Sequence, residues 1–258
     1  MHNLLKAEFF KLSKSFTYKL MIGMYLLFEI WDHMKAVTKD ILYTGVSYTG
    51  SERFFIMPAG TSYIEFMWIY AAVFVAGDFT NRNYAVSVVC GYPRRNIFGA
   101  KAVVYFVGML PVMLIHAVVG PTVWSMYYGW GREWGSGTVL FMLKPLAYYL
   151  CSFAVFGSTY FFFAMLAKNR IGAVAMNLFL TQGIGSVIGN ALMLLEDSVI
   201  RRLFEFLIQF SILQQVWDLR RGEHEMIYSF RLTFISSVAV TILMMLMATY
   251  IFCKHDMK

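Results

Sequence analysis

The sequence predicts an all-α membrane protein with six transmembrane helices, an N-terminal interfacial amphipathic helix and an outer amphipathic helix between spans five and six. Of the 258 residues, 59% are hydrophobic and only 14% are charged, whereas soluble domains carry about 25% charged residues. The mean hydropathy is +0.59. The apolar residues form long unbroken runs instead of the roughly ten-residue alternating segments of barrel strands, so the spans are expected to be helices.

Six stretches are long enough to cross a membrane, because a helical span needs about 20 apolar residues. They lie at about 17–35, 60–78, 101–127, 139–167, 171–195 and 230–253. The first is the least apolar, since Glu29, Asp32 and His33 lie in its second half. The whole chain, 1–258, is therefore predicted to form a single transmembrane domain.

The basic residues predict which side of the membrane each segment faces. With both termini inside, the inner segments hold 12 Lys and Arg against three acids, and the outer segments hold nine against ten. Because cytosolic flanks are enriched in Lys and Arg, both termini of this multi-pass chain are expected in the cytosol. Charge placed in this way also argues against nucleic acid as a partner. Cys90 and Cys253 are then cytosolic and Cys151 lies in a span, so all three are expected to be reduced thiols.

Two segments outside the spans have an apolar face. In residues 1–16 the apolar positions step by three and four, as on one side of a helix, and lysines lie off that side. These positions are Leu5, Phe9, Leu12 and Phe16, with Lys6, Lys11 and Lys14 beside them. The second stripe is Val199, Leu203, Phe206, Phe210 and Leu213. Both segments are expected to anchor in the membrane interface; alternatively, the first receives input from a partner and the second is an outer lid.

Motifs for catalysis by this chain alone are missing. No GxxxxGK[ST] P-loop, HExxH or paired-cysteine motif occurs in the sequence, so neither ATP hydrolysis nor a bound metal or other cofactor is expected here. Gly77-Asp78 resembles the Gly-Asp of intramembrane aspartyl proteases, but no second aspartate lies at matching depth in a neighbouring span. The chain is not expected to be an enzyme, and His116, in the third span, is interpreted as capping a local hydrogen bond.

The inner segment 79–100 interrupts the apolar sequence with a short basic stretch. Residues 81–89 are long enough for about two helical turns, Gly91-Tyr92-Pro93 breaks them, and Arg94 and Arg95 follow. A short helix ended by a Gly/Pro turn is suited to docking into a groove on another protein. The alternative is an ordinary reverse turn whose arginines contact lipid phosphates.

The whole chain resembles a type-2 ABC transporter permease, the membrane subunit of a bacterial ABC exporter. The start "LLKAEFFKLSKS" resembles the N-terminal interface helix of that family, and the six-span plan matches too. The segment "NYAVSVVCGYPRRNIFGAK" resembles its coupling segment, in which Pro93, Arg95, Ile97, Phe98 and Lys101 occupy the expected places. The sequence departs from the family before the short helix, where Glu and then Gly-Thr are common, and here Asp78, Asn81, Arg82 and Asn83 stand instead.

The resemblance implies a bacterial cell membrane protein that works with two copies of a separate ABC ATPase, which holds ATP and Mg²⁺. It also implies a second permease copy or a related permease, in contact with membrane lipids. In the coupling segment it implies that Tyr84, Val88 and Val89 insert into a groove of the ATPase, while Pro93, Arg94 and Arg95 fix the turn.

Polar residues in two spans are candidates for the transport path. In the fifth span, Gln182, Ser186 and Asn190 recur every four residues beside Gly185 and Gly189. Small residues let helices approach closely and amides hydrogen-bond across them, so this span either packs inside one subunit or lines the route at a dimer interface. In the second span, Glu65 needs a partner because an intramembrane carboxylate is costly. Lys144 is the expected one, and a cationic substrate is the alternative.

The family exports lipids, polysaccharides, drugs and peptides, and small members of this length often serve antimicrobial peptide export and self-immunity. The resemblance therefore favours an amphipathic or antimicrobial peptide, or a similar hydrophobic amphiphile, as the exported substrate. The alternatives are a lipid or drug exporter permease, a non-transporting membrane scaffold or sensor subunit, and an ion-coupled secondary transporter.

Overall fold

The computed structural model describes residues 1–39, 41, 48–57, 62–133, 135–179 and 226–254, and every element in these ranges is a helix. Three helices are long and apolar enough to cross a membrane: α7 (Arg94–Tyr128), α8 (Ser136–Ala167) and residues 234–254 of α13 (Met226–Lys254). They confirm the apolar runs predicted at 101–127, 139–167 and 230–253. The helix α7 begins earlier than that prediction, at Arg94.

The other predicted spans do not meet the same criterion of length and composition within the described residues. The helix α2 (Phe16–Lys39) is long enough, but it carries charged residues along its length: Lys19, Glu29, Asp32, Lys35 and Lys39. The stretch predicted at 60–78 is divided into α4 (Ser62–Tyr70), the π-helix η3 (Ala71–Ala76) and α5 (Gly77–Thr80). Of the stretch predicted at 171–195, the structure describes α9 (Arg170–Leu178), and residues 180–195 lie outside the described ranges.

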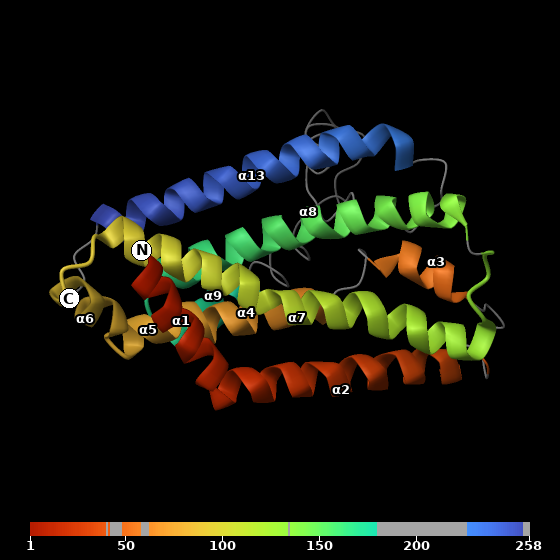
Figure 1. Ribbon diagram of the computed structural model, residues 1–258, viewed down its shortest axis with the longest axis horizontal. Coiled ribbons are helices and arrows are strands. Elements are labelled where there is room, and N and C mark those ends of the chain that lie inside the picture. The colour runs from red at the N-terminus through yellow and green to blue at the C-terminus, as the bar shows by residue number, and fades with distance from the viewer. Residues whose placement is uncertain (40, 42–47, 58–61, 134, 180–225, 255–258) are drawn as a thin grey trace, which may run out of the picture.

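The long helices α2, α7, α8 and α13 follow the long axis of the molecule (Figure 1). At one end lie the N-terminus, the end of α13, α1 (His2–Lys14), α5 and α6 (Asn83–Val89), and we call this the α6 end. At the other, which we call the α3 end, α2 and α7 finish and α8 starts beside α3 (Gly50–Phe55). The helix α13 packs on α8, while α2 and α3 pack on α7.

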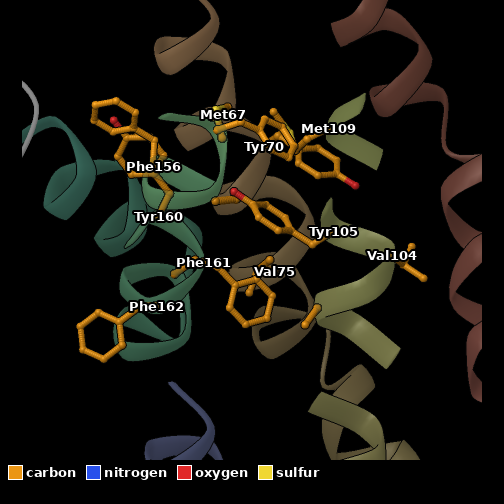
Figure 2. Close-up of a cluster of buried hydrophobic side chains, with 14 of the residues drawn as sticks. Met67, Tyr70, Val75, Val104, Tyr105, Met109, Phe156, Tyr160, Phe161 and Phe162 are labelled. Atoms are coloured by element: carbon orange, nitrogen blue, oxygen red, sulfur yellow. The ribbon is translucent and has the colours of Figure 1, made fainter. Parts of the chain in front are cut away.

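An aromatic core joins α4, η3, α7 and α8. Figure 2 shows Tyr70, Tyr105 and Phe161 converging between these helices. The ring of Tyr70 stacks between Phe74 and Tyr105, with ring centroids 5.1 and 5.3 Å away. Rings packed on both faces fix the spacing of the helices that carry them.

The N-terminal helix α1 exists as predicted, but a different face of it is buried. Leu4 and Leu12 are buried against the body of the protein, whereas Phe9 is 37% exposed and Phe16 is 75% exposed. The chain ends α1 at Lys14 and starts α2 at Phe16, so the expected stripe ending at Phe16 does not lie on a single helix. The second predicted amphipathic helix, 199–213, lies outside the described residues.

Candidate functional site

The predicted docking element is a seven-residue helix, α6, between two breaks in the chain. Arg82, just before it, has a left-handed backbone with φ of 57°, and Gly91, just after it, has φ of 84°. Pro93 then caps the start of α7. The short helix and its Gly/Pro turn are thus as predicted, but residues 94–100, expected in a loop, form the first turns of α7.

The exposed apolar residues of α6 are not all those expected. Val89 is 87% exposed and Val86 is 59% exposed, at i, i+3 spacing on one face. Tyr84 is only 3% exposed, and its hydroxyl donates a hydrogen bond to the Val75 carbonyl at 3.3 Å. Its ring also packs against Phe252 of α13. The expected insertion of Tyr84 into a partner is therefore wrong: Tyr84 holds α6 on the protein.

Val88 faces the core and is partly buried against it, so it belongs with Tyr84 and not with Val89. Val86 was missed by the sequence reasoning. Its spacing of three from Val89 is the signal that could have revealed it, because residues three apart share a helix face.

The two arginines at the start of α7 have different surroundings. Arg94 is half-buried, and its Nη1 donates to the Cys253 carbonyl at 3.0 Å, in the last turn of α13. Lys and Arg stabilise this position because helix C-termini leave carbonyls without intrahelical donors. Arg94 thus links α7 to α13 instead of pinning the turn to a partner. Arg95 and Pro93 are exposed, so they remain available to one.

A partly buried network of four charges lies beneath α6. Lys101 of α7 is 1% exposed, and its Nζ donates to Asp78 Oδ2 at 2.5 Å and to Glu8 Oε2 at 3.0 Å. Lys11 bridges the same two carboxylates, at 3.2 Å from Asp78 and 2.5 Å from Glu8. Asn83 of α6 donates to the other oxygen of Asp78 at 2.7 Å. One carboxylate therefore connects α1, α5, α6 and α7.

The charges of this network balance, two carboxylates against two ammonium groups, which is the arrangement that makes buried ions tolerable. Lys101 also lies 3.4 Å from the centroid of the Phe74 ring, a close cation–π contact. For Lys11, burial alone would lower the pKa, but the attraction of Asp78 and Glu8 outweighs it, and the pKa is raised above 10.5. Lys11 therefore stays charged at neutral pH.

A cavity of about 170 Å³ adjoins the network between α1, α2, η3 and α5, with Lys11, Asp78, Tyr18 and Arg170 in its wall. A Cβ atom at Gly77 would lie 3.0 Å from the Arg170 guanidinium. Glycine there lets Arg170 of α9 lie against α5. Arg170 is therefore a further basic side chain beside the network at the α6 end.

The structure does not bring together the residues predicted for the transport path. Glu65 is exposed on α4. The side chain of Lys144, its expected partner, lies outside those described. All the fifth-span candidates also lie outside the described residues: Gln182, Gly185, Ser186, Gly189 and Asn190.

In the described part of the chain, no group of three or more His, Cys, Asp and Glu side chains is arranged to hold a metal ion. The candidate site is the exposed face of α6, with Val86 and Val89, together with the charge network that supports it. In comparisons with known proteins, neither a family model nor a curated protein sequence matches this chain.

Proposed function

We propose that this chain is the six-span transmembrane subunit of an ATP-driven ABC exporter, with both termini in the cytosol of a bacterial cell, and that α6 is its docking helix. The observation that carries the proposal is the face of α6. Val86 and Val89 form an exposed apolar pair, with the exposed Arg82 and Arg95 in the flanking turns. A short helix with apolar anchors suits a groove on another protein, and basic neighbours give the contact its orientation.

The buried network supports this proposal by giving α6 a direct link to the long helices. A displacement of α6 acts on Asp78 through Asn83, and Lys101 passes it to α7. Glu8 carries the same displacement to α1. The partner proposed is a separate ATPase, in two copies, that binds ATP and Mg²⁺, and a second permease completes the assembly.

For the substrate we propose an amphipathic peptide, including antimicrobial peptides, or a similar hydrophobic amphiphile. The sequence is rich in adaptable apolar side chains, with 18 Met and 24 Phe. Such side chains accept varied apolar partners because they repack easily.

The docking proposal is tested with the double variant Val89→Asp, Arg95→Glu. Both side chains are exposed, so expression and melting temperature should stay those of the wild type. Loss of the charge-assisted contact of Arg95 weakens docking by about 1.5–3 kcal/mol, and loss of the apolar contact of Val89 adds to this. The affinity for the ATPase should therefore fall by more than about tenfold. The measurement is the amount of ATPase that co-purifies with the tagged permease, together with ATP-dependent transport of a fluorescent amphipathic peptide into inverted vesicles.

The control is Lys6→Glu, which makes the same charge reversal as Arg95→Glu at an exposed position of α1. It should leave both the bound ATPase and the transport unchanged. A double variant that keeps its full complement of ATPase would show that α6 is not the docking site. Bound ATPase with no transport of the peptide by the wild type would instead refute only the proposed substrate.

The proposed orientation makes a separate prediction about the exposed thiol of Cys90. In a Cys253→Ser background, with Cys151 buried, an impermeant maleimide applied to intact cells should not label the protein. The same reagent should label Cys90 in inverted vesicles, where the cytosolic side faces the reagent. Labelling of Cys90 on intact cells would reverse the orientation and place α6 outside the reach of any cytosolic ATPase.

A further inference from the structure

A second polar cluster is buried at the α3 end, far from α6. Glu29 and His33 of α2 are 1% and 3% exposed, and His116 of α7 is 5% exposed. Ser62, at the start of α4, donates its hydroxyl to Glu29 Oε1. The carboxylate of Glu29 thus ties three helices together. Buried polar groups of this kind need a complete set of hydrogen-bond partners.

His116 lies between two acceptors. Its Nε2 is 3.1 Å from the Met57 carbonyl oxygen, and its Nδ1 is 3.2 Å from Glu29 Oε2. The Ser62 hydroxyl is also 3.4 Å from Nδ1, but its single proton is donated to Glu29 Oε1. A carbonyl oxygen only accepts, so Nε2 carries a proton and donates it. The bond to Glu29 then needs another proton, which sits either on Nδ1 or on the carboxyl group. In both arrangements Glu29 and His116 together hold one additional proton, compared with an ionised carboxylate next to a neutral imidazole ring.

The partners of His33 show that the additional proton does not belong to that ring. The Arg53 Nη2 lies 3.5 Å from His33 Nδ1, and a guanidinium only donates, so Nδ1 accepts. The neutral ring then donates from Nε2 to Glu29 Oε2, at 3.3 Å. A proton added to Nδ1 would face the Arg53 cation. The geometry therefore assigns the additional proton to the pair of Glu29 and His116.

A cavity gives this pair a route to solvent. It has a volume of about 250 Å³ at the α3 end, and His33, Arg53, Met57 and His116 are in its wall. Gly120 of α7 faces the same space, and a Cβ atom there would lie 2.7 Å from His33 Nε2. Glycine at this position lets the His33 ring lie against α7 beside the pair.

We propose that Glu29 and His116 form a proton-binding site, reached through this cavity, whose bound proton holds α2, α4 and α7 together at the α3 end. When the proton leaves, one of the two hydrogen bonds of His116 breaks, and either the Met57 carbonyl loses its His116 donor or the Glu29 carboxylate loses one of its three. The fold is therefore most stable with the proton bound, and stability falls as pH rises and the proton dissociates.

Other titratable or charged groups surround the pair. They come from α2, α3, α4, α8 and the cavity wall: Tyr25, His33, Arg53, Tyr63, Tyr149 and Tyr48. Tyrosine titrates near pH 10 and arginine above pH 12. The part of the pH slope that is lost when Glu29 or His116 is replaced therefore reports on the pair.

The experiment measures the melting temperature of the purified full-length chain in detergent from pH 6 to pH 9. We expect the wild type to lose about 3 °C or more as pH rises. Glu29→Gln should remove this slope, because a neutral amide has no negative charge to hold the additional proton on the pair. The control His2→Gln changes a histidine that is exposed at the α6 end, and it should keep the slope of the wild type.

A second variant, His116→Gln, keeps the test open if Glu29→Gln does not fold. Its glutamine side chain does not titrate, so the pH slope that the pair contributes should also be lost. A wild-type melting temperature that is constant from pH 6 to pH 9 would overturn the proposal. So would a slope in Glu29→Gln or His116→Gln equal to that of the wild type.

Discussion

Lys101→Met is expected to lower the free energy of unfolding by about 3–5 kcal/mol, a large part of the total for a typical protein. Lys101 is 1% exposed and contacts both Asp78 and Glu8. Its removal leaves two carboxylates for the single ammonium group of Lys11, whose side chain is 40% exposed. Methionine fills similar space, so the loss comes from the unpaired charge. A thermal melt in detergent measures it.

The double variant Lys101→Met, Asp78→Asn is the matched control, since it removes one charge of each sign. It should be more stable than Lys101→Met alone, and the difference measures the coupling between the two residues. The variant Lys168→Met changes an exposed lysine at the same end and should stay within about 0.5 kcal/mol of the wild type. If Lys101→Met has the same melting temperature as Lys168→Met, the network does not hold the α6 end together.

Gly108→Ala is expected to destabilise the chain by about 1–3 kcal/mol, through overpacking. Gly108 lies in α7, where a Cβ atom would overlap the Tyr70 hydroxyl and lie 3.0 Å from Leu12 Cδ2. The Tyr70 ring cannot move aside easily, because it is stacked between Phe74 and Tyr105. In a chain of this size, the melting temperature should fall by about 2–4 °C for each kcal/mol.

Tyr70→Phe is the rescue for this substitution. The Tyr70 hydroxyl has no hydrogen-bond partner among the described residues, so removing it makes room without breaking a bond. Gly108→Ala, Tyr70→Phe should therefore recover most of the stability that Gly108→Ala loses. If the double variant is no more stable than Gly108→Ala, the clash is not with Tyr70, and a requirement for glycine in the backbone of α7 would explain the loss.

The parts of the fold that depend on local sequence could be predicted. The apolar runs of α7, α8 and α13 are each long enough to identify a helix without knowledge of its neighbours. The helix α6 was also predictable, because Gly91 and Pro93 break the chain after it. The division of 60–78 by η3 was not, because an apolar run looks the same whether it forms an α-helix or a π-helix.

The two polar clusters could not be predicted because their members are distant in the sequence. Glu29 and His116 are 87 residues apart, and Glu8 and Lys101 are 93 residues apart. The sequence alone shows only that some charges flank the predicted spans, and these help to predict the orientation of the chain. Among them are Glu8, Asp78 and Lys101. His116 was expected to make a local hydrogen bond, and instead it contacts α2 and Met57.

The burial of Tyr84 could not be predicted either, because one of its contacts is with a residue far away in the sequence. In the sequence it is an aromatic residue on a short helix next to a turn, as a docking residue would be. Its environment comes from Val75 and from Phe252, near the other end of the chain. Arg94 is a similar case, since its acceptor is the carbonyl of Cys253, 159 residues away.

The separation between Glu8 and Lys101 also sets an order for events at the ribosome. Lys101 is synthesised 93 residues after Glu8, which is roughly 5–20 s at about 5–20 residues per second. For most of that interval Glu8 is the only carboxylate of the network in the nascent chain, and Lys11 neutralises it. Asp78 follows, still 23 residues before Lys101. The N-terminal helix therefore has Lys11 as its provisional partner, and it reaches its final position only when α7 has been synthesised.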